Sequence, residues 1–308
     1  MDLSIILVNW NTREMLRDCL NSLTPALEGL KAEIRVVDNA SADGSVRMLR
    51  EEFPAVHLIR NTENRGFAAA NNQALAQATG RHVMLLNTDT LVHRDVLRAG
   101  VAWLDAHPRA GVLGPRVLNT DGSMQVSTSA FPSLGMLGLQ TLGLTRLAAF
   151  DRYRMTRWDR REERRVEVVS GCAMFVRGAA LREVGPLDES FFFYGEETDW
   201  CRRYAQAGWE VWFAPVGEIT HFGGGSVRAL NHRRDVLLTE GTVRLHRKHG
   251  GIGAGMACWA LLAGFNLSRA LAWQALRLTR RPGAAARATH FARVVRDLPR
   301  TWPREARA

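Results

Sequence analysis

The chain has 308 residues, of which 46% are hydrophobic and 23% charged, with a formal net charge of +10. This composition excludes a disordered chain, and the length suffices for one large α/β domain plus an appendage, or for two small domains. From residue 228 to the end, 16 Arg and Lys stand against 4 Asp and Glu, so this tail carries +12 and residues 1–227 about −2. The basic excess therefore belongs to one C-terminal module.

Short β-branched runs alternate with helical patterns through the first half of the chain. The runs predict strands at residues 4–10, 33–38, 56–60 and 82–87, and the spacing between them predicts helices at 12–23, 43–52 and 67–78. Crossover helices imply parallel pairing of the strands, so we expect an α/β fold with a doubly wound sheet. Regular structure is expected again at 166–177, and a later helix in ETDWCRRYAQAG is expected to stop near Gly208.

Polar side chains follow each of the four predicted strands. They are Asn9 and Asn11, Asp38 and Asn39, Asn61 and Asn64, and Asn87 with Asp89. For a single turn, the ordinary preference of Asn and Asp for strand exits and helix caps would be the better interpretation. Because ligands bind at the carboxyl ends of the strands in such sheets, four polar exits in succession favour a shared pocket.

The stretch FFFYGEETDW places Glu196, Glu197 and Asp199 within four positions, after four aromatic residues and Gly195. Desolvated like charges cost several kcal/mol unless a positive group lies opposite. Asp199 has Arg203 at i+4, so a structural salt bridge is at least as good an interpretation of Asp199 as a catalytic role. As an exposed pair, it would contribute about 0.5 kcal/mol.

One further carboxylate, Asp89 in LLNTDT, ends a strand at the expected pocket. Mg²⁺ and Mn²⁺ take oxygen ligands and bridge phosphate oxygens, and manganese also accepts imidazole, which His221 in THFGGGS could supply. Taken alone, His221 is better interpreted as a hydrogen-bonded loop histidine. The four cysteines have no C-x-x-C spacing, which predicts reduced thiols in a cytosolic protein and no structural zinc.

Seven motifs in order resemble inverting family 2 glycosyltransferases with the GT-A nucleotide-diphospho-sugar transferase fold, in the branch that includes rhamnosyltransferases. They are SIILVNWN, VVDNASADGS, NRGFAAANN, LLNTDT, SGCAMFVR, GPLDESFFFYGEETDWCRR and H-x-x-G-x-S, and they span roughly residues 3–227. The resemblance implies a GT-A catalytic domain at residues 1–227 with a doubly wound mixed sheet, followed by a basic helical region at 228–308.

The resemblance also implies a role for each matching residue. Asp38 would read the base or ribose of the nucleotide, in a pocket lined by Asn11, Asn64, Gly66 and Asn71. LLNTDT matches the family's D-x-D motif, in which Asn87 replaces the first acid and removes one negative charge. Asp89 would then hold a divalent cation, Mg²⁺ or Mn²⁺, on the sugar diphosphate, with His221 completing the metal site.

The helix that begins near Glu196 matches the family's E-D-x-D segment, where one carboxylate is the catalytic base. Glu197 occupies the position of the catalytic Asp and is longer by one methylene, so we assign the base to Glu197, with Glu196 and Asp199 as supports. In an inverting transfer, the base takes the proton of the acceptor hydroxyl as that hydroxyl attacks the anomeric carbon opposite the leaving diphosphate. No covalent sugar intermediate is needed.

The basic tail begins with a predicted helix at 232–250, followed by 17 residues without charge at 252–268. Trp259 and Trp273, flanked by Arg, are typical of a helix that lies on or dips into an anionic leaflet. The alternative is a helical hairpin packed on the catalytic domain. A nucleic-acid tail is disfavoured because no recognised binding motif accompanies the charge.

These patterns predict transfer of a sugar, with rhamnose as the first guess from the resemblance, from a nucleotide-diphosphate donor to a saccharide or polyprenyl-linked acceptor. The reaction would serve envelope polysaccharide assembly at the cytoplasmic face of the cell membrane. One alternative is a sugar nucleotidyltransferase, but VNWNTREM stands where a Gly-rich phosphate loop would be expected. The other is a non-catalytic sugar-nucleotide-binding scaffold, which Asn87 favours slightly and the intact Glu197, Asp89 and His221 disfavour.

Overall fold

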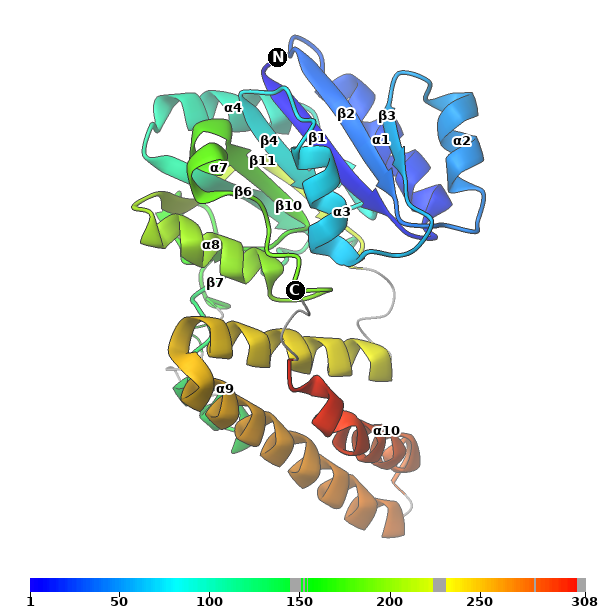
Figure 1. Cartoon of the computed structure of the whole chain (residues 1–308), viewed down its shortest axis with the longest axis vertical. Coiled ribbons are helices and arrows are strands. Elements are labelled where there is room, and N and C mark those ends of the chain that lie inside the picture. The colour runs from blue at the N-terminus through cyan, green and yellow to red at the C-terminus, as the bar shows by residue number, and fades with distance from the viewer. Residues whose placement is uncertain (145–150, 152, 154, 224–230, 280, 304–308) are drawn as a thin grey trace. The chain divides into compact units, whose positions relative to one another are not determined.

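The structure is a computed structural model that describes residues 1–144, 151, 153, 155–223, 231–279 and 281–303 (Figure 1). The chain divides into two compact units. The first comprises Met1–Phe131, Arg154–Glu189 and Glu196–Gly223, and the second comprises Pro132–Tyr153, Ser190–Gly195 and Gly224–Ala308. The domain boundary expected after residue 227 lies outside the described residues and stays a prediction.

A mixed sheet forms the centre of the first unit. In the described residues its strands are β1 (Leu3–Asn9), β2 (Ala32–Asp38), β3 (His57–Arg60), β4 (His82–Leu86), β5 (Thr90–Val92), β6 (Ala110–Leu118), β8 (Arg164–Arg165), β10 (Ala173–Arg177) and β11 (Glu210–His221). Their order is β3-β2-β1-β4-β10-β6-β11-β5, with β8 paired to β11. A separate small sheet pairs β7 (Thr128–Ser129) with β9 (Val168–Val169).

The direction of the strands changes across this sheet. β1 runs parallel to β2 and β4, and β2 runs parallel to β3, as expected for strands joined by crossover helices. β10 runs antiparallel between β4 and β6, and β5 runs antiparallel to β11. The predicted doubly wound mixed sheet is therefore confirmed.

Helices cover both faces of the sheet (Figure 1). One hydrophobic cluster joins the sheet to α1 (Arg13–Ala26), α2 (Ser45–Glu52) and α4 (Val96–Ala106). The other joins it to α3 (Gly66–Leu75), α7 (Gly178–Val184) and α8 (Glu196–Gln206). Within β1, Ile5 and Leu7 belong to the first cluster and Ile6 to the second, because successive side chains of a strand point to opposite faces.

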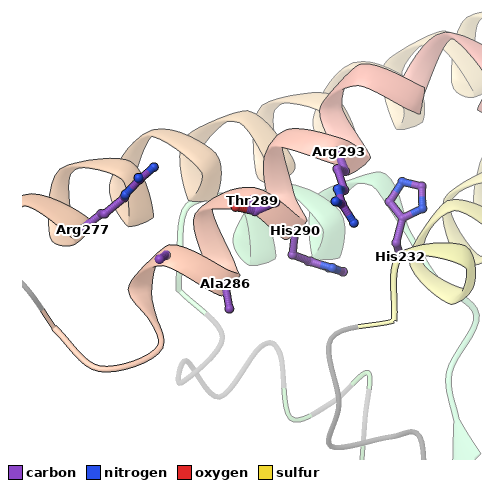
Figure 2. Close-up of a pocket in the computed structure, with 7 residues that line it drawn as sticks. His232, Arg277, Ala286, Thr289, His290 and Arg293 are labelled. Atoms are coloured by element: carbon purple, nitrogen blue, oxygen red, sulfur yellow. The ribbon is translucent and has the colours of Figure 1, made fainter.

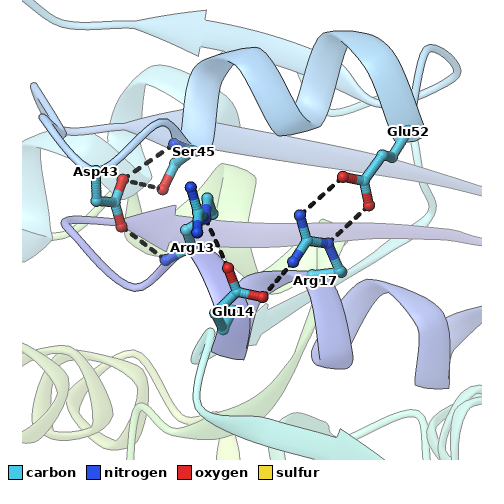
Figure 3. A network of polar contacts seen from close by, with 6 residues as sticks. All are labelled: Arg13, Glu14, Arg17, Asp43, Ser45 and Glu52. Atoms are coloured by element: carbon cyan, nitrogen blue, oxygen red, sulfur yellow. Dashed lines mark hydrogen bonds and ion pairs between the residues drawn. The ribbon is translucent and has the colours of Figure 1, made fainter.

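A polar network on the surface ties the first two turns of α1 to both ends of α2 (Figure 3). Asp43 accepts hydrogen bonds from the backbone N–H of Arg13 (2.8 Å) and from that of Ser45 (3.0 Å). The guanidinium of Arg17 makes two hydrogen bonds with Glu52, of 2.7 and 2.8 Å, and also contacts Glu14. The exposed ion pairs of Arg17 contribute at most about 1 kcal/mol each. The hydrogen bond between Arg13 and Asp43 joins the segments that follow β1 and β2.

The second unit is helical in its described part. It contains α5 (Leu134–Thr141), α9 (His232–Leu278), α10 (Ala284–Asp297) and a short 3₁₀ helix at Leu298–Thr301. Gly251 has φ of +78° inside α9 and divides it into two helical segments, at the junction between the predicted helix 232–250 and the uncharged run. The C-terminal helical region expected from the sequence is thus confirmed.

The core of the second unit is small and centres on Leu137, Val243 and Cys258. Arg269 of α9 donates to the carbonyl oxygens of Gln140 and Thr141, which satisfies the C-terminal end of α5. The four cysteines of the chain, Cys19, Cys172, Cys201 and Cys258, are all free and buried, in agreement with reduced thiols.

Candidate active site

The carboxyl ends of β1 and β2 meet through Asn9 and Asp38. Asn9 Nδ2 donates to Asp38 Oδ1 (2.9 Å) and to Ser41 Oγ (3.0 Å), while Asp38 Oδ2 accepts from the backbone N–H of Ser41 (3.0 Å). Asn11 Oδ1 accepts from the backbone N–H of Ala42 at 2.7 Å, so the same two loops are joined a second time. Two of the residues expected to bind the nucleotide, Asn11 and Asp38, therefore lie side by side.

The end of β2 is linked to the loop after β3 through Asn39. Its Nδ2 donates to Asn64 Oδ1 and to the carbonyl of Gly66, both at 3.1 Å, and its Oδ1 accepts from Asn61 Nδ2 at 2.9 Å. Gly66 has φ of +81°, which favours glycine at the start of α3. The structure thus brings Asn64 and Gly66 to the β2 loop. Asn71 instead donates to the carbonyl of Phe67 within α3, at 2.8 Å.

The end of β4 lies beside the end of β11, because Thr90 of β5 pairs with His221. His221 Nε2 is 3.2 Å from Asp89 Oδ1 and 3.5 Å from Asn87 Nδ2. On the other side of the ring, His221 Nδ1 is 2.7 Å from Gln125 Oε1. A carbonyl oxygen only accepts, so Nδ1 carries a proton and, in the neutral ring, Nε2 presents its lone pair to Asp89.

The side chains of Asp89 and His221 are suitable ligands for a divalent cation. A lone pair on Nε2 and a carboxylate oxygen 3.2 Å apart are both acceptors, so a proton or a cation must lie between them. Imidazole and carboxylate oxygen are ligands that Mn²⁺ accepts. Among the described residues, no group of three or more His, Cys, Asp and Glu side chains could hold a metal ion. Asp89 and His221 fit as two protein ligands, and the remaining ligands would have to come from Asn87, a diphosphate or water.

Gln125 is a residue that sequence analysis did not single out. Besides contacting the ring of His221, it donates from Nε2 to Asn119 Oδ1 at 2.9 Å and to the His221 carbonyl at 3.4 Å. It therefore orients His221 in the way that outer partners orient metal-binding histidines. No local signal marks Gln125, because its partner lies 96 residues further along the chain.

The three carboxylates at the start of α8 have three different environments. Glu196 is 5% exposed, and its Oε2 has no hydrogen-bond partner among the described residues. Burial, in the first place, and the neighbouring charge of Glu197 raise the pKa of Glu196 well above its ordinary value. Glu196 is therefore a neutral acid over a wider pH range than an exposed glutamate, and a poor proton acceptor there.

Asp199 is fully buried and paired, with Arg203 Nε 2.9 Å from its Oδ2. The predicted i+4 pair is confirmed, but the prediction that it is exposed is wrong, because α8 packs this side against the sheet with Trp200 and Tyr204. Arg203 also donates to the carbonyls of Val184 and Pro186. Removing one partner of this buried pair therefore costs more than the ~0.5 kcal/mol of an exposed i+4 pair, because it leaves a buried charge without its partner.

Glu197 is half-buried and lies close to the segment that enters β10. A Cβ atom added to Gly171 would lie 3.7 Å from Glu197 Cβ. Burial, in the first place, and the negative charges of Asp89 and Glu197 together raise the pKa of the neighbouring Cys172 thiol to about 11. Cys172 is thus near both acids, so the structure brings the expected base and the expected metal ligand to the same edge of the sheet.

The protonation of Glu196 leads to a prediction about stability. Because its pKa is raised in the fold, the folded chain keeps this proton to a higher pH than the unfolded chain, whose pKa is near 4.5. The carboxyl group therefore destabilises the fold increasingly as pH rises from about 4.5 through the folded pKa. Glu196→Gln, which mimics the neutral acid, should match the wild type near pH 4 and exceed its stability at pH 8.

Urea denaturation across this pH range measures the difference. Glu51→Gln, on the exposed side of α2, is the matched control, and its difference from the wild type should not change with pH in this way. A Glu196→Gln protein that is less stable than the wild type at pH 8 would contradict a raised pKa of Glu196.

Known glycosyltransferases resemble this chain in sequence. The model of glycosyl transferase family 2 matches residues 4–184. Over 233 residues the chain is 30% identical to an N-acetylglucosaminyl-diphospho-decaprenol L-rhamnosyltransferase of Mycobacterium tuberculosis, covering 71% of this chain and 75% of the relative. It is 26% identical over 206 residues to the low-salt glycan biosynthesis hexosyltransferase Agl10 of Haloferax volcanii, covering 66% and 61% of the two chains.

Solved structures show the same fold. The mannosyltransferase PcManGT from Pyrobaculum calidifontis, in complex with GDP-Man and Mn²⁺, has a TM-score of 0.56 at 18% identity, over 97% of this chain and 86% of that chain. S. aureus TarS 1–349 has a TM-score of 0.52 at 16% identity, over 97% and 92%. The match of the family model over more than half of the chain, together with the mycobacterial relative, shows that this chain belongs to glycosyl transferase family 2, and it has the GT-A fold.

Proposed function

We propose that this glycosyltransferase inverts the sugar it transfers, with Glu197 as the general base. The observation that carries the proposal is the difference among the three carboxylates of α8. Glu196 is buried with a raised pKa, and Asp199 is fully buried against Arg203, whereas Glu197 reaches solvent. A base must contact the acceptor hydroxyl to take its proton, and of these three acids Glu197 alone is not fully buried.

Different residues would act on the sugar and on the nucleotide of the donor. Glu197 would take the proton of the acceptor hydroxyl as the oxygen attacks the anomeric carbon, and the bond to the diphosphate would break on the opposite face. Asp38, with Asn11, Asn64, Gly66 and Asn71, would bind the nucleotide. The hydrogen bonds that join the loops after β1, β2 and β3 support this, because they hold these groups in place before the donor arrives.

Asp89 and His221 would hold a divalent cation, Mg²⁺ or Mn²⁺, with Asn87 beside them. When bound, the cation would offset the negative charge that grows on the leaving diphosphate. The support is the short distance between His221 Nε2 and Asp89 Oδ1 and the fixed proton on Nδ1. Two structural neighbours, PcManGT and GalNAc-T7, were crystallised with Mn²⁺.

For the substrates, we propose a nucleotide-diphospho-rhamnose donor and a saccharide or polyprenyl-linked acceptor. The mycobacterial relative, whose name describes transfer of L-rhamnose to N-acetylglucosaminyl-diphospho-decaprenol, supports both. The reaction would then belong to envelope polysaccharide assembly, in the cytoplasm at the inner face of the cell membrane. Membership of a glycosyltransferase family favours this reaction over nucleotidyl transfer, and the accessible carboxyl group of Glu197 favours it over a non-catalytic scaffold.

The test is release of nucleoside diphosphate from a panel of nucleotide sugars, with a polyprenyl-diphospho-N-acetylglucosamine acceptor and Mg²⁺ or Mn²⁺. We expect deoxythymidine-diphospho-rhamnose to be turned over fastest, and NMR of the product to show an anomeric configuration opposite to that of the donor. A product with retained configuration would exclude the single displacement. Turnover of another sugar with inversion would keep the mechanism and correct the donor.

A further inference from the structure

A cavity of about 450 Å³ lies within the second unit, between α9 and α10. Figure 2 shows Thr289, His290 and Arg293 along α10, with Arg277 and His232 contributed by α9. Four basic side chains therefore line the cavity, and the described residues that line it include no carboxylate. None of the residues expected to bind the donor or perform the reaction belongs to it.

The basic side chains of the cavity differ in whether their charge is matched. His290 Nε2 lies 2.8 Å from Asp235 Oδ2, and His232 Nε2 lies 3.0 Å from Asp297 Oδ2. Arg277 and Arg293 are exposed and form no hydrogen bond or ion pair with any described residue. Figure 2 shows these two guanidinium groups at opposite ends of the cavity, so each offers its paired N–H donors to a separate phosphate group.

An exposed apolar stripe runs along the same helix. After Gly251, the large side chains of α9 that face solvent are Ile252 (63% exposed), Met256 (58%), Leu267 (48%), Leu271 (64%) and Leu278 (86%). At about 100° of rotation per residue, these five fall within an arc of about 100°. Leu278 directly follows Arg277, so the stripe ends at the basic cavity.

The two tryptophans expected to face a membrane do not form this stripe. Trp259 Nε1 donates to the carbonyl of Leu298, and Arg287 of α10 lies 4.5 Å from the ring centre of Trp273. Both rings therefore pack within the second unit. In the described part of the chain, α9 is also the one helix long and apolar enough to cross a membrane, on length and composition alone.

We propose that Arg277 and Arg293 each bind the phosphate of an anionic membrane phospholipid while the α9 stripe rests in the apolar layer beside them. This inference rests on the proposed function in one respect: a lipid-linked acceptor would place the enzyme at a membrane. The tail's charge of +12 favours an anionic leaflet, and the stripe favours an amphiphile over a free phosphate ion. The cavity then fixes the depth and orientation of the helices on the lipid surface.

The experiment uses the full chain and measures its partition onto vesicles by sedimentation. The variant is Arg277→Gln/Arg293→Gln, and its matched control is Arg47→Gln/Arg50→Gln, which removes the same charge from the exposed side of α2. On phosphatidylglycerol vesicles we expect the cavity variant to bind roughly 10- to 30-fold more weakly than the wild type, and the control to stay within about twofold. Equal binding by wild type and cavity variant, or equal loss in both variants, overturns the proposal.

Two further measurements distinguish a lipid phosphate from a free phosphate ion and from charge attraction alone. Vesicles of equal charge that carry a sulfonate lipid should show a smaller difference between wild type and cavity variant; an undiminished difference would mean charge attraction without a phosphate site. Ten millimolar inorganic phosphate should leave vesicle binding of the wild type unchanged, whereas displacement would assign the cavity to a free phosphate. Leu271→Gln/Leu278→Gln should also weaken vesicle binding, and wild-type binding by this variant would exclude the stripe.

Transfer to a detergent-solubilised acceptor separates this proposal from the proposed function. The cavity variant should retain that transfer, since its arginines lie outside the residues assigned to the reaction. A wild type that binds phosphatidylglycerol vesicles but transfers no sugar would refute the proposed function and leave the lipid site standing.

Discussion

Glu197→Gln should lower the rate of sugar transfer by about 100- to 10,000-fold, the usual contribution of a general base, while donor affinity changes little. The amide keeps the shape and most hydrogen bonds of the side chain but cannot accept the proton of the acceptor hydroxyl. Steady-state transfer and donor binding are measured under identical conditions. Wild-type transfer by Glu197→Gln would show that the base is another residue.

The neighbouring acids supply the controls for this experiment. Glu196→Gln should have a smaller effect on transfer than Glu197→Gln, because Glu196 is buried and its carboxyl does not reach the acceptor hydroxyl. Asp199→Asn should lower the free energy of unfolding by about 1–3 kcal/mol, since Arg203 keeps two carbonyl partners and loses its charged one. A well-folded but inactive Asp199→Asn, beside an active Glu197→Gln, would move the base to Asp199.

Asp89→Ala should weaken binding of Mn²⁺, in the presence of nucleoside diphosphate, by more than about 100-fold. Loss of a residue that only orients a ligand weakens metal binding by about 10- to 100-fold, and Asp89 is proposed as a direct ligand. Gln125→Ala should fall within that smaller range, because it removes the acceptor that fixes the proton on His221 Nδ1. Titration of free Mn²⁺ by electron paramagnetic resonance measures both without relying on activity.

Asp18→Ala is the matched control, since it removes one exposed carboxylate from α1 and should leave Mn²⁺ binding unchanged. Full donor turnover in excess chelator, or wild-type activity of Asp89→Ala, would contradict the proposed metal site. A Gln125→Ala protein that binds Mn²⁺ as the wild type does would remove Gln125 from the metal site but leave Asp89 in it.

The sequence by itself determined the features that depend on neighbours along the chain. The alternation of β-branched runs with helical spacing predicted β1 to β4 and α1 to α3 close to their observed bounds, because local periodicity governs which face of each element is buried. The i+4 spacing of Asp199 and Arg203 predicted their pair, since the geometry of a single helix is enough to bring them together.

Tertiary structure alone decided which strands meet and which charges are buried. β10 enters between β4 and β6, and it brings Cys172 close to both Asp89 and Glu197. Gln125 reaches His221 across 96 residues. Glu196 is buried with a raised pKa, whereas Asp199 is buried beside Arg203, and a sequence pattern does not contain the depth to which α8 packs against the sheet. Burial sets the pKa of a carboxyl group, so the distinction between a buried acid, a paired acid and an accessible acid appears only in the folded chain.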